Sequence, residues 1–139
     1  MVQAQPDAQQ IVRSRLPAGG VRAREIMSSP PITIGPDCSV AELAGLLSKH
    51  RISGVPVVDA HGELLGVATE ADVLERPGDR VCEVMTSMVA TVEEDTPVEE
   101  IAGLFARQRI KRVPVVRGRQ TVGVVSRADI VRAIGQAWR

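Results

Sequence analysis

The chain of 139 residues contains one pattern twice, and this duplication constrains its fold more than any other feature. Residues 51–72 read RISGVPVVDAHGELLGVATEAD, and residues 109–129 repeat them as RIKRVPVVRGRQTVGVVSRAD. The offset is 58 residues at first and 57 residues later, because the second copy has a shorter turn. A unit of this length buries too little surface to be stable alone. We therefore expect the two halves to form one fold with pseudo-two-fold symmetry.

The hydrophobic pattern of each half predicts the order strand, helix, strand, strand, helix. Ser39 is a helix cap, and an apolar stripe with the spacing i, i+3, i+4, i+7 follows it. Residues 55–58 are apolar and rich in β-branched side chains, which indicates a buried strand with Pro56 at its start or on an edge. The other elements expected are strands at 32–34 and 64–68 and a helix that begins at Thr69. The fold class is therefore α/β (α+β), with two β-α-β-β-α repeats and their sheets packed together.

The composition of the N-terminal segment differs from that of the repeats. Residues 1–20 are rich in Gln and Ala, and a Pro-Ala-Gly-Gly run at 17–20 is expected to detach one helical turn that begins near Asp7. In the second repeat, Thr96 is expected to cap a helix with Pro97 at its first position. The expected divisions are a flexible N-terminal arm at 1–20, a first repeat at 21–79 and a second repeat at 80–139.

Aliphatic residues must form the core, because hydrophobic residues make up 44% of the chain and aromatic residues only 1%. The 17 basic and 17 acidic residues cancel, so the net charge favours neither nucleic acid nor an anionic membrane as a partner. Cys38, Cys82, His50 and His61 offer no spacing typical of zinc, so no metal is expected. There is no leader pattern and no apolar run of the ~18 residues that span a bilayer, which predicts a cytoplasmic protein.

Two motifs recur in fixed order in both halves, and together they resemble a tandem pair of CBS domains, the arrangement called a Bateman module. The first motif is G-h-P-h-h-D, where h is apolar; residues 54–59 fit it, and residues 112–117 fit it with arginine at both ends. The second is G-h-h-T/S-x-x-D, at residues 66–72 and 123–129. Each motif alone is weak evidence, but the ordered pair occurring twice is specific. The resemblance covers residues 21–137.

This resemblance implies a regulatory module that binds adenosine-containing ligands in clefts between the repeats. The ligands implied are AMP, ADP, ATP or S-adenosylmethionine, and no cofactor is required. Asp72 and Asp129 are then expected to hold the ribose hydroxyls, with Thr69 and Ser126 at the ribose or phosphate. The residues expected around the adenine are Ile32, Thr33, Val55, Pro56, Val89, Thr91, Val113 and Pro114. A homodimer formed through helix faces and an unknown regulated protein are also expected.

The residues support ligand binding independently of the resemblance. A carboxylate in the first turn of a helix accepts two hydrogen bonds from a vicinal diol, and the free N–H groups there favour an anion. One alternative stays open. Thr69-x-x-Asp72 and Ser126-x-x-Asp129 are also capping-box patterns, in which each helix satisfies its own first turn. Both roles can coexist at one carboxylate.

The two halves differ in charge where a phosphate is expected. Residues 107–119 carry six basic and no acidic side chains, and Arg127 lies inside the second motif, where the first has Glu70. We therefore expect the second cleft to hold the phosphate, with Lys111, Arg112 and Arg127 as its partners. The alternative is a solvated basic face.

Other classes of protein fit less well. The chain has no G-x-S-x-G motif, no P-loop and no histidine beside a plausible catalytic partner, so an enzyme is not expected. Nucleic acid binding is disfavoured because stacking aromatic residues are absent. The main competitor is a ligand-free structural dimerisation or interaction module.

Overall fold

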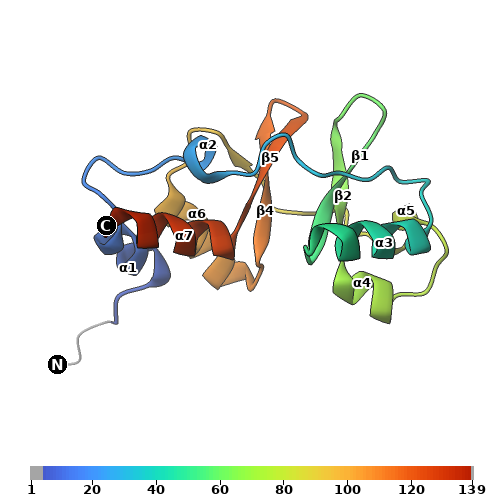
Figure 1. Ribbon diagram of the computed structural model, residues 1–139, viewed down its shortest axis with the longest axis horizontal. Coiled ribbons are helices and arrows are strands. Elements are labelled where there is room, and N and C mark those ends of the chain that lie inside the picture. Colours follow the sequence, from blue (N-terminus) through green and yellow to red (C-terminus); the bar gives the residue numbers. More distant parts are fainter. Residues whose placement is uncertain (1–4, 139) are drawn as a thin grey trace. The chain divides into compact units, whose positions relative to one another are not determined.

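The structure is a computed structural model that describes residues 5–138. These residues form seven helices and five strands in two small sheets, which confirms the predicted α+β class (Figure 1). The helices are α1 (Ala8–Arg15), α2 (Ala23–Ile26), α3 (Val40–His50), α4 (Glu70–Glu75), α5 (Val81–Val84), α6 (Val98–Gln108) and α7 (Arg127–Ala137). The strands are β1 (Gly54–Val58), β2 (Leu64–Thr69), β3 (Val92–Glu93), β4 (Arg112–Arg117) and β5 (Gln120–Ser126).

The chain forms two compact units that do not coincide with the sequence repeats. Unit 1 contains α1, α2, β3, α6 and α7 with most of β4 and part of β5, whereas unit 2 contains α3, β1, β2, α4, α5 and the hairpin tip at 117–122. Helices α2 and α5 are therefore exchanged: each belongs to the compact unit that consists mainly of the other sequence repeat. Helix α2 is joined to unit 1 by the N–H of Ala23, which donates to the carbonyl of Thr96 at 2.9 Å. Helix α5 is joined to unit 2 by the N–H of Val81, which donates to Cys38 at 2.9 Å.

In unit 2, β1 pairs with β2 in an antiparallel register that places Val57 opposite Gly66. Ile34 adds one parallel bridge beside Val57, so the strand expected at 32–34 is reduced to a single bridging residue. The buried core consists of Ile34, Leu43, Leu47, Val55, Val57, Ala68, Val81 and Val84. Burying such a valine, leucine or isoleucine side chain contributes about 1.5 to 3 kcal/mol.

Helix α3 forms as its sequence predicts. The hydroxyl of Ser39 accepts the N–H of Glu42 at 3.0 Å and so satisfies one donor of the first turn. Leu43 and Leu47 lie one turn apart and are both buried. The helix ends at His50, and its C-cap residue, Arg51, has a φ of 53° in the left-handed region that closes many helices.

In unit 1, β3 lies parallel to β4, with Val92 opposite Val115, and β5 completes the order β3-β4-β5. Helix α6 buries Val98, Ile101 and Phe105, which follow the helical spacing. Helix α7 starts directly after β5. The sequence therefore places a helix at the end of the last strand in each half.

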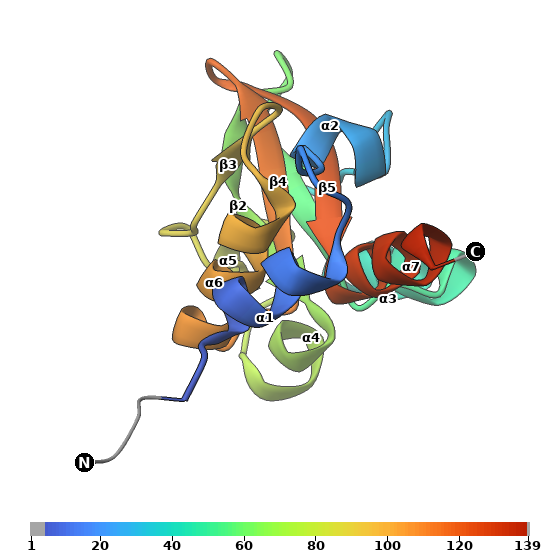
Figure 2. The ribbon, with the colours of Figure 1, turned by 90° about the vertical axis from the view of Figure 1, so that its left-hand side faces the viewer.

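The N-terminal segment differs from the detached arm that the sequence predicts. Helix α1 extends over two turns and lies beside α6, as both ribbon views show (Figures 1 and 2). Asp7 closes a capping box with Gln10, and Arg13 forms an ion pair with Glu99 of α6 at 3.7 Å. The Pro-Ala-Gly-Gly run therefore works as a turn between α1 and α2 within unit 1.

Pro56 lies at the third position of β1, not at its start or on a free edge as expected. The pairing explains why a proline is accepted there. Val67, which lies opposite Pro56, exchanges both of its main-chain hydrogen bonds with Thr86 at 2.9 Å. The Pro56–Val67 pair therefore needs no N–H from Pro56.

The start of α6 also differs from the prediction. Pro97 is the N-cap residue rather than the first helical residue. The Thr96 hydroxyl accepts the N–H of Glu93 at 3.0 Å and does not cap the helix. A threonine before a proline therefore stabilises the turn between β3 and α6 instead.

Candidate functional site

The first candidate carboxylate, Asp72, is held where β2 passes into α4. Thr69 ends the strand and is the N-cap of the helix. Oδ2 of Asp72 accepts the main-chain N–H of Thr69 at 2.9 Å and its hydroxyl at 3.1 Å. The Thr69 hydroxyl oxygen accepts the N–H of Asp72 at 3.3 Å, and the Asp72 residue is 7% exposed. The carboxylate is therefore fixed and nearly buried.

The second carboxylate, Asp129, repeats this geometry in the other unit. Oδ2 of Asp129 accepts the N–H of Ser126 at 2.8 Å and its hydroxyl at 3.0 Å. The Ser126 hydroxyl oxygen accepts the N–H of Asp129 at 3.3 Å, and Asp129 is also 7% exposed. The capping-box interpretation is confirmed at both helices.

The remaining oxygen of each carboxylate meets an arginine of the same helix. Oδ1 of Asp72 lies 3.4 Å from Nε of Arg76, and Oδ1 of Asp129 accepts a hydrogen bond from Arg132 at 3.1 Å. Both arginine side chains are at least half exposed. Neither arginine was predicted as a partner from the sequence, although spacings of four and three residues on a helix bring side chains together.

The two arginines are held differently. Arg76 also donates to the carbonyl oxygens of Val84 and Met85, at 3.5 and 3.4 Å. Among residues 5–138, Arg132 has no partner other than Asp129. Moving Arg132 away from Asp129 therefore breaks fewer interactions than moving Arg76 away from Asp72.

Main-chain hydrogen bonds join each candidate helix to the residue directly before the proline-containing strand of its own unit, β1 or β4. The N–H of Glu70 donates to the carbonyl of Ser53 at 2.9 Å, and the N–H of Arg127 donates to that of Lys111 at 3.0 Å. In unit 2, Thr69 also lies opposite Gly54 in the sheet. The two sequence motifs thus meet in space within each unit.

The residues expected around the adenine are placed unevenly. Val55 belongs to the core of unit 2, and Val113 is completely buried. Their side chains therefore contribute to the protein interior rather than to an open wall. Pro56 and Pro114 are also buried, whereas Ile32, Thr33 and Val89 are half-buried and Thr91 is exposed.

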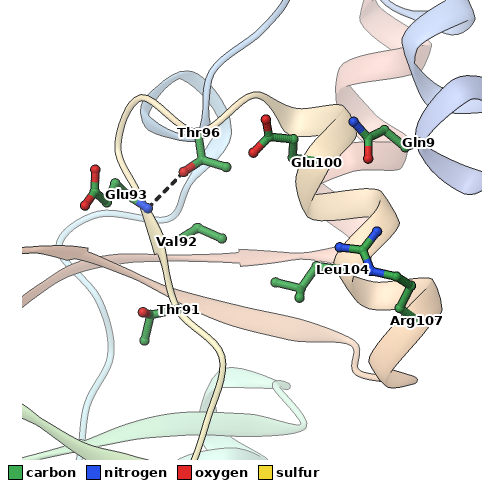
Figure 3. A pocket seen from close by; sticks show the side chains of 8 residues that line it. All are labelled: Gln9, Thr91, Val92, Glu93, Thr96, Glu100, Leu104 and Arg107. Atoms are coloured by element: carbon green, nitrogen blue, oxygen red, sulfur yellow. Dashed lines mark hydrogen bonds between the residues drawn. The ribbon is translucent and has the colours of Figure 1, made fainter.

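Thr91 lines a shallow cavity of about 460 Å³ in unit 1 (Figure 3). The other lining residues come from α1, β3 and its following turn, and α6, and they include Gln9, Glu93, Glu100 and Arg107. None of the residues expected at the ribose or phosphate lines this cavity. The structure therefore does not bring Thr91 into one cavity with Ser126 and Asp129.

Two of the three phosphate candidates line a different groove. Lys111 and Arg127 border a groove of about 520 Å³ along α1, α6 and α7. Neither Ser126 nor Asp129 lines it. Arg112 is half-buried and has an interaction of its own within the described residues.

The glycine of the second motif has a packing role in each unit. A Cβ added to Gly66 would overlap the carbonyl oxygen of Thr86 and lie 3.2 Å from Cα of Ser87. A Cβ added to Gly123 would lie 2.6 Å from Sδ of Met27 and 3.1 Å from the carbonyl oxygen of Ser28. These close approaches hold the exchanged segments against the sheets.

The described residues show neither a metal cluster nor a membrane helix. Between residues 5 and 138, no three His, Cys, Asp or Glu side chains come together as a metal site requires. Within the same range, every helix is too short or too polar to cross a bilayer.

The fold and the two strand-to-helix sites define a doubled α+β module with one capped carboxylate in each unit. The family model for the CBS domain matches twice, at residues 23–79 and 81–136. The chain therefore belongs to the CBS domain family and contains a pair of these domains.

Relatives support the same assignment. The chain is 40% identical over 116 residues to L-aspartate semialdehyde sulfurtransferase of Methanocaldococcus jannaschii, a match that covers 81% of this chain and 23% of that protein. It is 35% identical over 115 residues to inosine-5'-monophosphate dehydrogenase of Mycobacterium tuberculosis, covering 80% of this chain and 22% of the enzyme. The chain thus spans less than a quarter of these relatives.

Solved structures share the fold over nearly their whole length. The CBS domain pair of MJ0100 in complex with 5'-methylthioadenosine and S-adenosyl-L-methionine has a TM-score of 0.79 and 38% identity, covering 84% of this chain and 98% of that one. CBSX2 in complex with AMP has a TM-score of 0.82 and 27% identity, covering 86% and 100%.

Proposed function

We propose that this CBS pair is a regulatory module that binds an adenosine-containing ligand, such as AMP, ADP, ATP or S-adenosylmethionine. The observation that carries the proposal is how the two oxygens of each buried carboxylate, Asp72 and Asp129, are hydrogen-bonded. Oδ2 of each is occupied by two donors of its own helix cap, whereas Oδ1 of each meets only an exposed arginine. A carboxylate has about four acceptor sites, so each Oδ1 retains capacity for a ribose hydroxyl. The cap and the ligand role are therefore compatible.

Similar proteins support this choice of ligand. The MJ0100 and CBSX2 structures contain 5'-methylthioadenosine, S-adenosyl-L-methionine or AMP. All three molecules carry an adenosine with a ribose diol. The shared chemistry is thus a diol, which a fixed carboxylate recognises, and not a particular phosphate.

We propose that the site at Ser126 and Asp129 binds the ligand more tightly than the site at Thr69 and Asp72 does. A ribose hydroxyl must displace the arginine from Oδ1, and Arg132 has a single partner while Arg76 has three. The positive charge of Lys111, Arg112 and Arg127 favours an anionic ligand in the same unit. The site at Thr69 and Asp72 would then bind more weakly.

The adenine of the ligand is proposed to contact main-chain atoms and half-buried side chains. Val55 and Val113 are buried, so their main chain rather than their side chains is available to the adenine. Pro56 and Pro114 are buried as well, so Ile32 and Thr33 are the remaining side-chain candidates in the first site. Val89 is the half-buried candidate from the second repeat, because the cavity that Thr91 lines contains neither Ser126 nor Asp129.

A second candidate function is a ligand-free interaction module without enzymatic activity. The completed capping boxes favour it, because each carboxylate already stabilises its own helix without a ligand. The ligand-binding proposal adds a population shift that passes to a regulated protein. Binding of an adenosine-containing ligand by the purified chain would support the regulatory module over the ligand-free interaction module.

The deciding experiment is a thermal-shift panel on the purified chain. AMP, ADP, ATP and S-adenosylmethionine are each added at millimolar concentration, and cytidine monophosphate, which shares the ribose phosphate of AMP, is the control. A ligand held only by the folded state stabilises it by about 2.7 kcal/mol at one hundred times its Kd. We expect the melting temperature to rise with at least one adenosine ligand. If none of these ligands raises the melting temperature, the ligand-free interaction module is the function that remains.

A further inference from the structure

The shallow cavity of unit 1 that Thr91 lines lies apart from the proposed nucleotide sites, since neither Ser126 nor Asp129 borders it. Its volume of about 460 Å³ is within the range of small-molecule sites in proteins. Helix α6 forms one wall of the cavity, with Glu100 and Arg107 among the lining residues (Figure 3). The cavity is therefore available to a ligand other than the nucleotide.

Two opposite charges of α6 border this cavity without a partner. Glu100 and Arg107 are both exposed and lie about two turns apart on the helix. Among residues 5–138, neither side chain forms an ion pair or a hydrogen bond. The third charged residue of the lining, Glu93, turns its carboxylate away from α6 (Figure 3). The cavity therefore offers one free carboxylate and one free guanidinium.

Gly103 determines where the guanidinium of Arg107 lies. A Cβ added at Gly103 would lie 2.9 Å from Nη1 of Arg107 and 3.1 Å from Oε1 of Gln9 in α1. Gly103 is buried, although a glycine inside a helix costs about 1 kcal/mol relative to alanine. The guanidinium is thus laid back along α6 to the level of residue 103, which is about 4.5 Å of helix rise from Glu100. The two free charges are separated by roughly one helical turn and do not pair with each other.

We infer that this cavity binds a small zwitterion, a free α-amino acid with an aliphatic side chain. Glu100 accepts hydrogen bonds from its ammonium group, and Arg107 donates hydrogen bonds to its carboxylate. The aliphatic side chain packs on Val92 and Leu104, the apolar part of the lining. A ligand with only anionic groups is repelled by Glu100, and one with only cationic groups is repelled by Arg107. A zwitterion therefore satisfies both charges at once.

Helix α1 completes this site. Gln9 is half-buried in the lining, and its amide N–H group donates to the ligand carboxylate beside Arg107. No residue of α1 is buried, so a ligand that contacts Gln9 also fastens α1 to α6. The first repeat has Glu42 and Lys49 at the equivalent positions of α3, but the described part of unit 2 contains no counterpart of α1. This second pair of charges provides a matched control.

Titration of L-valine into the isotope-labelled full chain, followed by NMR chemical shifts, tests the site. Because both charges are exposed, we expect a dissociation constant of about a millimolar. Isovalerate lacks the ammonium group and isobutylamine lacks the carboxylate, so each should bind at least about 10-fold more weakly. Glu100→Gln and Arg107→Gln should each weaken L-valine binding by the same factor, whereas Glu42→Gln and Lys49→Gln should not change it. Gly103→Ala keeps every charge but displaces Arg107, and it should also weaken binding.

The expected shifts lie in α1, including Gln9, and in α6. The inference is overturned if L-valine gives no saturable shifts, or if isovalerate or isobutylamine binds as tightly as L-valine. It is also overturned if Glu42→Gln weakens binding as much as Glu100→Gln, or if the shifts are confined to the residues around Asp129. AMP titration of Glu100→Gln separates this inference from the proposed function, because AMP binding should not change in that variant.

Discussion

Gly66 and Thr86 are in main-chain contact, because a Cβ at position 66 would overlap the carbonyl oxygen of residue 86. This contact joins β2 to the exchanged segment that follows α5. The equivalent glycine, Gly123, has mainly the flexible side chain of Met27 as its neighbour. The two equivalent glycines therefore differ in how well their surroundings tolerate an added side chain.

We expect Gly66→Ala to lower the free energy of unfolding by about 3 kcal/mol and Gly123→Ala by about 1 kcal/mol. The reason is that the backbone at Thr86 cannot move aside, whereas the Met27 side chain can. Urea denaturation measures both values. The control is Gly45→Ala within α3, where the new methyl group meets nothing within 4 Å. That variant should gain about 0.5 to 1 kcal/mol, and equal losses at Gly66 and Gly123 would contradict the account.

The two arginines beside the carboxylates should respond differently to removal. Arg132→Ala loses one exposed ion pair, which costs no more than about 0.5 kcal/mol of unfolding free energy. Arg76→Ala also removes the donor to Val84 and Met85, and we expect a loss of about 1 kcal/mol. Because Arg132 competes for Oδ1 of Asp129, its removal should tighten AMP binding about two-fold in calorimetry. Weaker AMP binding would show instead that Arg132 contacts the ligand.

Thr121 offers a test of the packing in unit 2. Its hydroxyl oxygen is buried and has no hydrogen-bond partner in the described structure. Valine has the same shape without the polar group, so Thr121→Val should leave the unfolding free energy unchanged or raise it by about 1 kcal/mol. A clear loss in thermal or urea unfolding would show that the hydroxyl has a partner in solution.

Local sequence was sufficient for the elements whose signals lie within one turn. The cap at Ser39 and the stripe of Leu43 and Leu47 predicted α3, and the capping-box alternative predicted how Asp72 and Asp129 are held. In these cases both partners of each contact are three or four residues apart. A short window of sequence therefore contains both residues of the contact, and the contact can be predicted from it.

The features that were missed depend on partners far apart in the chain. Helix α2 joins unit 1 through Thr96, which is 73 residues from Ala23, and nothing in a short window indicates this exchange. The packing of α1 against α6 was hidden for the same reason. Pro56 was misplaced because its acceptance depends on Val67 turning its hydrogen bonds toward Thr86.

The capped carboxylates allow the helix role and the ligand role to be separated by one substitution. In Asp129→Asn the amide oxygen is expected to face Ser126, because the amide nitrogen would meet two donors there. The cap is then kept, while the outward oxygen becomes an NH₂ group that cannot accept a ribose hydroxyl. Asp72→Asn is the matched change in the other unit.

Calorimetric titration of AMP into the wild type, Asp129→Asn and Asp72→Asn is therefore the most direct measurement. With urea unfolding showing each variant within about 1 kcal/mol of the wild type, we expect Asp129→Asn to weaken the tighter AMP site at least about 10-fold. Asp72→Asn should leave that site intact. Unchanged AMP affinity in Asp129→Asn, or no AMP binding by the wild type, would contradict the claim that this carboxylate receives the ribose.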